Sequence, residues 1–369
     1  MKIFQVRPGS YNTLLRGKRL SQQFWTDQQA KVERARLNWV KLNQKTLRAD
    51  RYQGLVDAKD NGDLASSGNR IILAPSITGS PRWYVERTQD ALALVARRGK
   101  PTLFITVTCN IKWPEIQESL YPGETAFDRP DICARVFKRK INLLLDLIVD
   151  KKIFGGVVWW VYTIEWQKRK GLPHMHLLVT LEDVPKSPRE VDELVSAEIP
   201  DPSNTRLYKA VLDHMIHGPC GLLHPNSPCM QSIGESTVKI CKKDFPKEFA
   251  KETKLVDMAF PVYRRRQKED GGREAVIGKH MDTVVDNRWV VPYNPYILLK
   301  LDCHVNVILV TSGPLSPKYL YKYQFKGPDR VLMRVQGQQT DEVEEFVTGR
   351  YISASESVWK LQDIPIHGR

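Results

Sequence analysis

The amino-acid sequence predicts an α+β fold in which helices flank an antiparallel sheet. Residues 103–108 (LFITVT) are rich in β-branched side chains and predict a strand. Residues 130–149 place leucine and isoleucine on one helical face and basic residues on the other, which predicts an amphipathic helix. Residues 157–166 and 174–181 are apolar runs joined by a short basic connector, as in a β-hairpin. A strand, a helix and an antiparallel strand pair in this order are typical of α+β domains.

The region before the first strand is predicted to be mostly helical, and we assign it to residues 1–100. Residues 19–60 repeat apolar and aromatic side chains every three or four positions among charges. A Gly/Ser/Asn-rich break follows at residues 61–69. A second helical pattern covers residues 83–98 and ends at Gly99, a residue type common just beyond helix ends.

The region after the hairpin is predicted to carry an insertion at about residues 183–285. This stretch contains a proline-rich part, three cysteines and a polar, charged segment. Sequence typical of a protein core returns at residues 289–310. Within it, strands are predicted near residues 297–300 and 305–310.

A helix is predicted to start at Ser316, because a serine N-cap followed by Pro317 in the first helical position is a common start signal. We therefore assign residues 101–340, insertion included, to one α+β core. Residues 341–369 are expected to form a C-terminal helix and an extended tail.

Charge and hydropathy narrow the classes of function. The formal net charge is +14 and the pI is about 9.4, so a polyanion such as nucleic acid is the first candidate partner. No apolar run approaches the roughly 18–20 residues of a membrane-spanning helix, and the N-terminus lacks the apolar stretch of a signal peptide. The expectation is a protein that acts inside the cell, without a membrane partner and with its six cysteines reduced.

Two histidines on the second hairpin strand are candidate metal ligands. His174 and His176 flank Met175, and residues two apart in a strand point to the same face. The facing strand end offers Glu165 and Gln167 as oxygen donors. Two imidazoles with an amide or carboxylate and open coordination positions suit Mg²⁺ or Mn²⁺ engaged with a phosphate oxygen. The alternative is two histidines with no metal role, since the H-x-H pattern is common.

Two tyrosines of the segment after Pro317 are candidate nucleophiles. Tyr319 and Tyr323 are four residues apart and would share a helix face, whereas Tyr321 would point elsewhere. Lys322 and Lys326 lie close to that face and could stabilise a phosphorus transition state or lower a phenol pKa. The alternative is an amphipathic helix that packs its aromatic side chains into a core.

Three cysteines in the insertion are candidate ligands of a structural zinc ion. Cys220, Cys229 and Cys241 lie close together in the sequence, and His217 or His224 could complete a four-ligand set. The spacing is not the paired CxxC of zinc fingers, so reduced cysteines in a compact insertion are the alternative. The other three cysteines have apolar neighbours and are expected in the core: Cys109, Cys133 and Cys303.

The basic hairpin connector is a candidate DNA-backbone contact. Lys168, Arg169 and Lys170 adjoin the histidine pair, which favours phosphate binding over a merely solvated loop. Trp166 and Trp113 could stack on unpaired bases, although packing in the core explains them equally well.

Taken together, these motifs resemble the HUH (His-hydrophobe-His) endonucleases, in particular the replication-initiator (Rep) region of Helitron transposases, which is of the two-tyrosine type. The segment GLPHMHLLV matches the HUH motif, and KYLYKYQFKG matches the two-tyrosine motif. Further similar blocks are RYQGLVDA (51–58), LFITVTCNIKWPEI (103–116), YTIEWQKRKGLPHMH (162–176), DNRWVVPYNPYILLKLDCHVNV (286–307) and RYISASESVWKL (350–361).

The resemblance implies an RRM/ferredoxin-like sheet and a metal-dependent nuclease that nicks and transfers single-stranded DNA at transposon ends. It implies a covalent 5′-phosphotyrosine on Tyr319 or Tyr323, as in rolling-circle transposition. In relatives a third ligand lies seven residues before the first histidine, so the resemblance ranks Gln167 above Glu165. Helitron transposases also carry a helicase, but the sequence has no G-x-x-x-x-G-K-[ST] loop. A fragment of a longer transposase or an inactive copy is therefore expected.

Two other functions fit parts of the sequence. A catalytically inactive single-strand DNA-binding module would keep the same sheet and basic surface. A zinc-stabilised RNA-binding protein would leave the tyrosine pair without a role. On the favoured interpretation, the protein acts on DNA in the nucleus.

Overall fold

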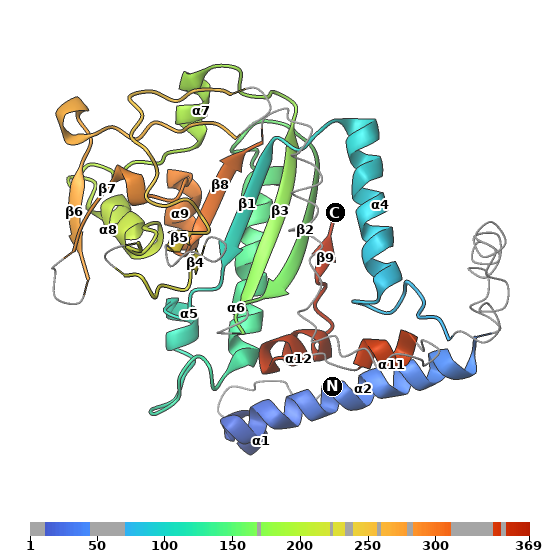
Figure 1. Ribbon diagram of the computed structural model, residues 1–369. Coiled ribbons are helices and arrows are strands. Elements are labelled where there is room, and N and C mark those ends of the chain that lie inside the picture. Colours follow the sequence, from blue (N-terminus) through green and yellow to red (C-terminus); the bar gives the residue numbers. More distant parts are fainter. Residues whose placement is uncertain are drawn as a thin grey trace.

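A five-stranded antiparallel sheet with strand order β8-β1-β3-β2-β9 forms the centre of the protein (Figure 1). Its strands are β1 (Leu103–Thr108), β2 (Val157–Trp166), β3 (Pro173–Leu181), β8 (Val305–Leu309) and β9 (His367–Gly368). The computed structural model describes residues 12–44, 71–167, 171–221, 224–232, 239–256, 260–278, 283–310, 342–347 and 352–369. The predicted α+β class is confirmed, and the predicted strands at residues 103–108 and 157–166 have the observed bounds.

One face of this sheet carries the main hydrophobic core. The helices on this side are α5 (Pro114–Gln117), α6 (Pro130–Leu145), α9 (Pro295–Leu301) and α12 (Ala354–Leu361), and α6 continues into a π-helical turn (Asp146–Asp150). Along the chain, β1, α6, β2, β3, α9 and β8 follow the β-α-β-β-α-β order of ferredoxin-like folds. The three cysteines predicted to lie in the core are buried: Cys109, Cys133 and Cys303.

The opposite face is covered at one end by α4 (Pro81–Arg98), which packs Ala91 against apolar side chains of the sheet. The hydroxyl of Ser80 caps this helix by accepting from the backbone N–H of Trp83, and Gly99 follows it with a φ of 91°. The other end of the same face carries polar side chains of β1, β2 and β3. The helical prediction for residues 83–98 is confirmed.

The N-terminal helices are α1 (Thr13–Arg16) and α2 (Arg19–Leu42). Helix α2 runs beside α12 and α11 (Glu342–Val347), which come from the far end of the chain (Figure 1). It buries Trp25, Leu37 and Val40, whose spacing puts them on one helical face. The helical prediction for residues 19–60 therefore holds as far as Leu42, and residues 45–70 lie outside the described residues.

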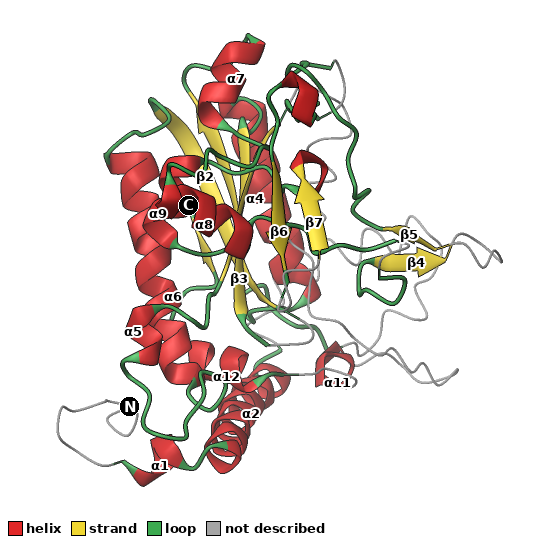
Figure 2. Cartoon of the chain, turned by 90° about the vertical axis from the view of Figure 1, so that its left-hand side faces the viewer, coloured by secondary structure: helices red, strands yellow, loops and turns green. Residues whose placement is uncertain are grey.

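The predicted insertion supplies most of a second hydrophobic cluster, which is built from residues between Ile199 and Leu298. Its elements are α7 (Pro188–Leu194), α8 (Thr205–His214), the hairpin of β4 (Met230–Ser232) and β5 (Lys239–Cys241), the hairpin of β6 (Glu274–Ile277) and β7 (Thr283–Asp286), and the 3₁₀ turns Lys268–Asp270 and Asn287–Trp289. Figure 2 shows both small hairpins on the side of the main sheet away from α6. Buried Arg265 ties the cluster together by donating to the carbonyls of Asn287 (2.6 Å) and Val290 (2.7 Å).

Two sequence predictions near the C-terminus need correction. The strand predicted at residues 297–300 is wrong, because these residues belong to α9. The Asn294 side chain accepts from the N–H of Ile297 (2.9 Å) and Pro295 occupies the first turn, so helix-capping geometry outweighs the strand preference of the apolar run. The predicted C-terminal helix and tail prove to be α11, α12 and the edge strand β9, which pairs with β2.

Candidate metal centre

The middle strand β3 presents His174 and His176 on the sheet face that α4 leaves uncovered. Strand pairing places Glu165 of β2 opposite His174 on one side and Thr108 of β1 opposite it on the other. The alternate residues of β3, such as Met175, point into the main core and anchor the strand. The predicted same-face arrangement of the two histidines is therefore present, on the middle strand of the sheet.

The two imidazoles and one carboxylate lie within bonding range of one another. His176 Nε2 is 2.8 Å from Glu165 Oε1, and the two imidazole rings are 4.7 Å apart at 84°. One ligand atom each from Glu165, His174 and His176 can be chosen so that all lie within 4.8 Å of one another. We call this group the histidine centre.

Neighbouring side chains fix both imidazole rings. His174 Nδ1 shares a hydrogen bond with the Thr108 hydroxyl (2.9 Å). Nε2 is therefore the ring nitrogen of His174 that is left to bind a metal ion. His176 is only 6% exposed and stacks on Phe104 at 5.7 Å. Its Nδ1 is buried and, among the described residues, lacks a hydrogen-bond partner. The other ring nitrogen, Nε2, lies beside the Glu165 carboxylate, and the ring adjoins a second imidazole, an arrangement chemically suited to a bound cation.

Electrostatics keeps the His174 imidazole neutral. Desolvation by the surrounding atoms holds the pKa of His174 well below its usual range. Repulsion from His176, His304 and Lys243 lowers the pKa of His174 further. A neutral imidazole has the lone pair that metal binding requires.

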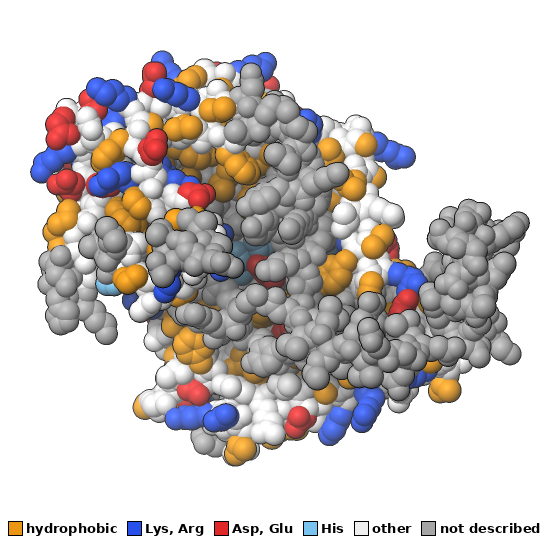
Figure 3. Space-filling view, in the orientation of Figure 1, with side chains coloured by type: hydrophobic (Ala, Val, Ile, Leu, Met, Phe, Trp, Pro, Cys, Tyr) orange, Lys and Arg blue, Asp and Glu red, His pale blue; other side chains and the backbone are white. Residues whose placement is uncertain are grey.

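The Glu165 carboxylate contacts His176, and Gln167, the third ligand that the family resemblance ranks first, follows two residues later and stays a prediction. Strand β2 ends at Trp166, and the backbone of Gln167 closes the hairpin turn. Its N–H donates to Leu172 O (3.0 Å) and its carbonyl accepts from the N–H of Gly171 (2.7 Å). The Glu165 side chain remains 38% exposed, so solvent reaches this side of the histidine centre. In Figure 3, histidine and acidic side chains are visible in a hollow at the middle of this face.

Several predicted site residues lie elsewhere. The candidate nucleophiles Tyr319 and Tyr323 lie outside the described residues, as do Lys322 and Lys326 and the connector residues Lys168, Arg169 and Lys170. Trp166 belongs to the opposite sheet face, where it packs edge-on against Trp359 at 6.2 Å. Trp113 is fully buried. These positions favour core packing over base stacking for both tryptophans.

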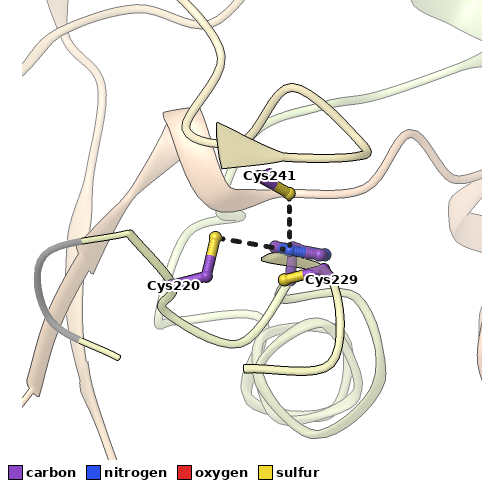
Figure 4. Close-up of side chains that lie close together, drawn as sticks. Cys220, Cys229 and Cys241 are labelled. Carbon is purple, nitrogen blue, oxygen red and sulfur yellow. Dashed lines mark hydrogen bonds between the residues drawn. The ribbon is translucent and has the colours of Figure 1, made fainter. Parts of the chain in front are cut away.

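A second group of potential ligands lies in the insertion. The sulfurs of Cys220, Cys229 and Cys241 gather around one imidazole ring (Figure 4), which belongs to His217. His217 Nε2 is 3.7 Å from Cys220 Sγ and 3.5 Å from Cys241 Sγ. All four ligand atoms lie within 4.8 Å of one another. We call this group the cysteine cluster, and it is compatible with a bound metal ion.

Local structure supports the cysteine cluster. Burial alone would raise the pKa of Cys241, but hydrogen bonds from the backbone of Phe245 and Lys243 outweigh it and lower that pKa. The imidazole of His217 stacks on the Phe245 ring at 4.3 Å. His224, the other histidine considered from the sequence, is exposed and is not in the group.

Thr108 belongs to the histidine centre, although no motif in the sequence pointed to it. Thr108 ends β1 and is separated from His174 by 66 residues, so only strand pairing brings them together. The available signal was the alternation of Thr106 and Thr108 with apolar residues in a strand, which predicts that both hydroxyls share one face.

Comparison with known families bears on the first half of the chain. Residues 1–179, which include both histidines, match the family described as "Helitron helicase-like domain at N-terminus". Over this region the chain is similar to that family. No curated protein matches the sequence. No helix in the described part of the chain combines the length and apolar character needed to cross a bilayer.

Proposed function

We propose that this protein is a metal-dependent endonuclease and strand transferase for single-stranded DNA in a Helitron-related transposition system. The observation that carries the proposal is the histidine centre: two imidazoles and a carboxylate converge on one accessible sheet face. The net charge of +14 suits a polyanionic substrate. DNA as the substrate also fits the Helitron-related region and implies action in the nucleus.

In this proposal His174, His176 and Glu165 hold a divalent cation, with Mg²⁺ or Mn²⁺ the best suited. Such a cation supplies Lewis-acid polarisation of a phosphate oxygen. Thr108 orients the His174 ring through Nδ1, and Phe104 supports the ring of His176. These contacts hold the ligands in place before substrate arrives, which lowers the cost of assembling the site.

Strand cleavage in this proposal uses a phenol as the nucleophile. The oxygen of Tyr319 or Tyr323 attacks phosphorus, and the bond to the 3′ oxygen breaks. The phenol proton is lost to solvent, and the leaving oxygen gains a proton to become a 3′-hydroxyl. The DNA remains attached through a 5′-phosphotyrosine, and Lys322 and Lys326 would stabilise the charge on phosphorus. The second tyrosine would serve a second transesterification.

The direct test is incubation of the protein with end-labelled single-stranded DNA and Mn²⁺, followed by a denaturing gel. The proposal expects a covalent protein–DNA adduct that disappears with chelator. DNA binding without cleavage would instead favour the inactive DNA-binding module.

We expect single-stranded DNA to be cut much faster than a blunt duplex of the same sequence. The histidine centre lies on a sheet face between α4 and the insertion, so a phosphate must reach a recessed surface. A stiff duplex cannot do so without local melting, whereas a single strand bends freely. Parallel time courses on the two substrates measure the difference, and equal rates would contradict the proposed geometry.

We further propose that the cysteine cluster binds a structural zinc ion, since three thiolates and an imidazole are a typical zinc set. Purified protein should contain about one zinc, and Cys229→Ser should lower the melting temperature by about 5–10 °C. His217→Ala should also release zinc, whereas His224→Ala, at an exposed histidine outside the cluster, should retain it. Elemental analysis checks each variant, and folded wild-type protein without zinc would refute the site.

A further inference from the structure

The histidine centre is part of a larger polar area on its sheet face. Strand pairing aligns His176 of β3 with Thr106 of β1, and Thr106 in turn with Asn306 of β8. Directly paired residues of antiparallel strands point to the same face, so these three side chains lie on the face of the histidine centre. The polar area therefore crosses two strand spacings, about 10 Å, from β3 to β8 (Figure 1).

Asn306 is the member of this polar area whose hydrogen bonding is incomplete. Its side chain is partly exposed, but its Oδ1 is buried and has no hydrogen-bond partner in the described part of the chain. Val305 and Val307, which flank it on β8, are buried in the main core, so Asn306 points to the opposite face. A buried amide oxygen without a partner is unfavourable, which indicates a partner that arrives with a ligand.

Hydrogen bonds on both sides of β8 fix the strand that carries Asn306. On its outer side, the N–H of Val307 donates to Pro292 O (3.0 Å), and the N–H of Leu309 donates to the Tyr263 hydroxyl (2.9 Å). On its inner side, β8 pairs with β1. The Asn306 amide is therefore carried by a rigid backbone, which lowers the cost of binding a ligand there.

We propose that Asn306, with Thr106 beside it, binds the edge of a nucleobase of the single-stranded DNA whose phosphate lies at the histidine centre. This inference rests on the proposed function, because it assigns the base specificity of the same substrate site. It makes DNA binding depend on the identity of one base.

The chemistry of DNA favours a base over a phosphate as the partner of Asn306. The Oδ1 atom only accepts hydrogen bonds, so its partner must carry a donor. Within a continuous DNA strand the phosphodiester and the deoxyribose have no donor, whereas every base has one. The amide of Asn306 offers one donor and one acceptor, which match an amino group beside a ring nitrogen, as in adenine and cytosine.

The surroundings of Asn306 also suit a base. The two strand spacings between β3 and β8 are comparable with the distance from a phosphate to the outer edge of its own base. Ile308 lies two residues further along β8 on the same face, and it packs partly buried against the cluster beneath α4. It offers the flat face of a base an apolar neighbour. Thr106 and Asn306 are uncharged, as expected for a contact to a base edge.

The test is a selection of preferred sequences from a random pool of single-stranded DNA. Protein is incubated with the pool and Ca²⁺ in place of Mn²⁺, and the bound molecules are sequenced. Wild type should enrich adenine or cytosine roughly five- to hundredfold at one position of the selected motif. Asn306→Ala should lose the preference at that position alone. Its overall affinity should stay within about threefold of wild type, because phosphate contacts supply most of the affinity.

Two further variants separate base recognition from a structural role. Asn306→Asp keeps the size of the side chain but has only acceptors, so it should shift the preference toward guanine, which carries two adjacent donors. This shift can be measured even if Asn306→Ala fails to fold. Asn142→Ala removes the same amide from an exposed position of α6, on the other side of the sheet, and should keep the wild-type preference.

Three results would overturn the inference. They are an unchanged preference in folded Asn306→Ala, a loss of preference at every position in that variant, and wild-type protein that binds single-stranded DNA without preference for any base. None of them affects the proposed nuclease, which the adduct assay tests separately with wild-type protein. If wild-type protein neither binds nor cuts single-stranded DNA, the proposed function itself fails and this inference falls with it.

Discussion

Alanine at His174 or at His176 should reduce metal-dependent cleavage of single-stranded DNA by roughly 10²- to 10³-fold or more. Each substitution removes one of the three side chains that define the histidine centre. DNA binding should change little, because lysine and arginine contacts to phosphates supply most of the affinity. Cleavage rates and binding constants measured on the same preparations separate the two effects.

The double variant His174→Ala/His176→Ala provides the decisive control. It should be inactive in chelator-treated buffer to which Mg²⁺ or Mn²⁺ has been restored. Undiminished nicking by this variant would falsify the assignment of the histidine centre as the catalytic metal site. A folded state comparable to wild type, verified by its melting temperature and zinc content, excludes a trivial loss of structure.

The same assay identifies the third ligand. Because the Glu165 carboxylate lies 2.8 Å from His176 Nε2, Glu165→Gln should weaken Mn²⁺ binding by about 10- to 100-fold. The backbone of Gln167, not its side-chain amide, shapes the hairpin turn. Gln167→Ala should therefore have a much smaller effect on Mn²⁺ binding. A larger effect at Gln167 would support Gln167 as the third ligand, as the family resemblance implies.

The strands of the sheet could be predicted because local sequence patterns indicate them. Residues 103–108 and 157–166 combine β-branched and aromatic side chains in short runs. Such runs favour a strand without any information on distant contacts. The stretch at residues 297–300 shows the opposite case. Its apolar side chains suit a strand or a buried helix equally, and the cap formed by Asn294 decides for the helix. The pairing of β9 with β2 joins residues about 200 positions apart, which periodicity alone does not reveal.

The residues of the candidate site could also be predicted where local sequence patterns indicate them. The His174 and His176 pair follows from strand alternation, and the three cysteines follow from their proximity in the sequence. The contact of Glu165 with His176 depends on how β2 pairs with β3, and the choice of His217 over His224 depends on how the chain folds after α8. Contacts such as Thr108 with His174 depend on strand register, which the sequence does not specify.

Phenylalanine at both Tyr319 and Tyr323 should abolish the covalent protein–DNA adduct. The substitution removes both nucleophilic oxygens but keeps the aromatic rings, so the fold and the metal content should be retained. The sequence predicts a helix here, in which these two residues share a face and Tyr321 is turned by about 200° from Tyr319. Tyr321→Phe should therefore leave the adduct intact and serves as the matched control.

Single substitutions and the DNA-linked peptide show which of the two phenols attacks the DNA. Either single variant, Tyr319→Phe or Tyr323→Phe, should retain some adduct if the two phenols can replace one another, and lose all of it if only one is positioned to attack. Mass spectrometry of the DNA-linked peptide identifies the residue used. A nucleotide on Tyr321 would contradict the predicted helix face. Cleavage with no adduct in wild-type protein would instead indicate attack by water, and the strand-transfer step would then have no covalent intermediate to proceed from.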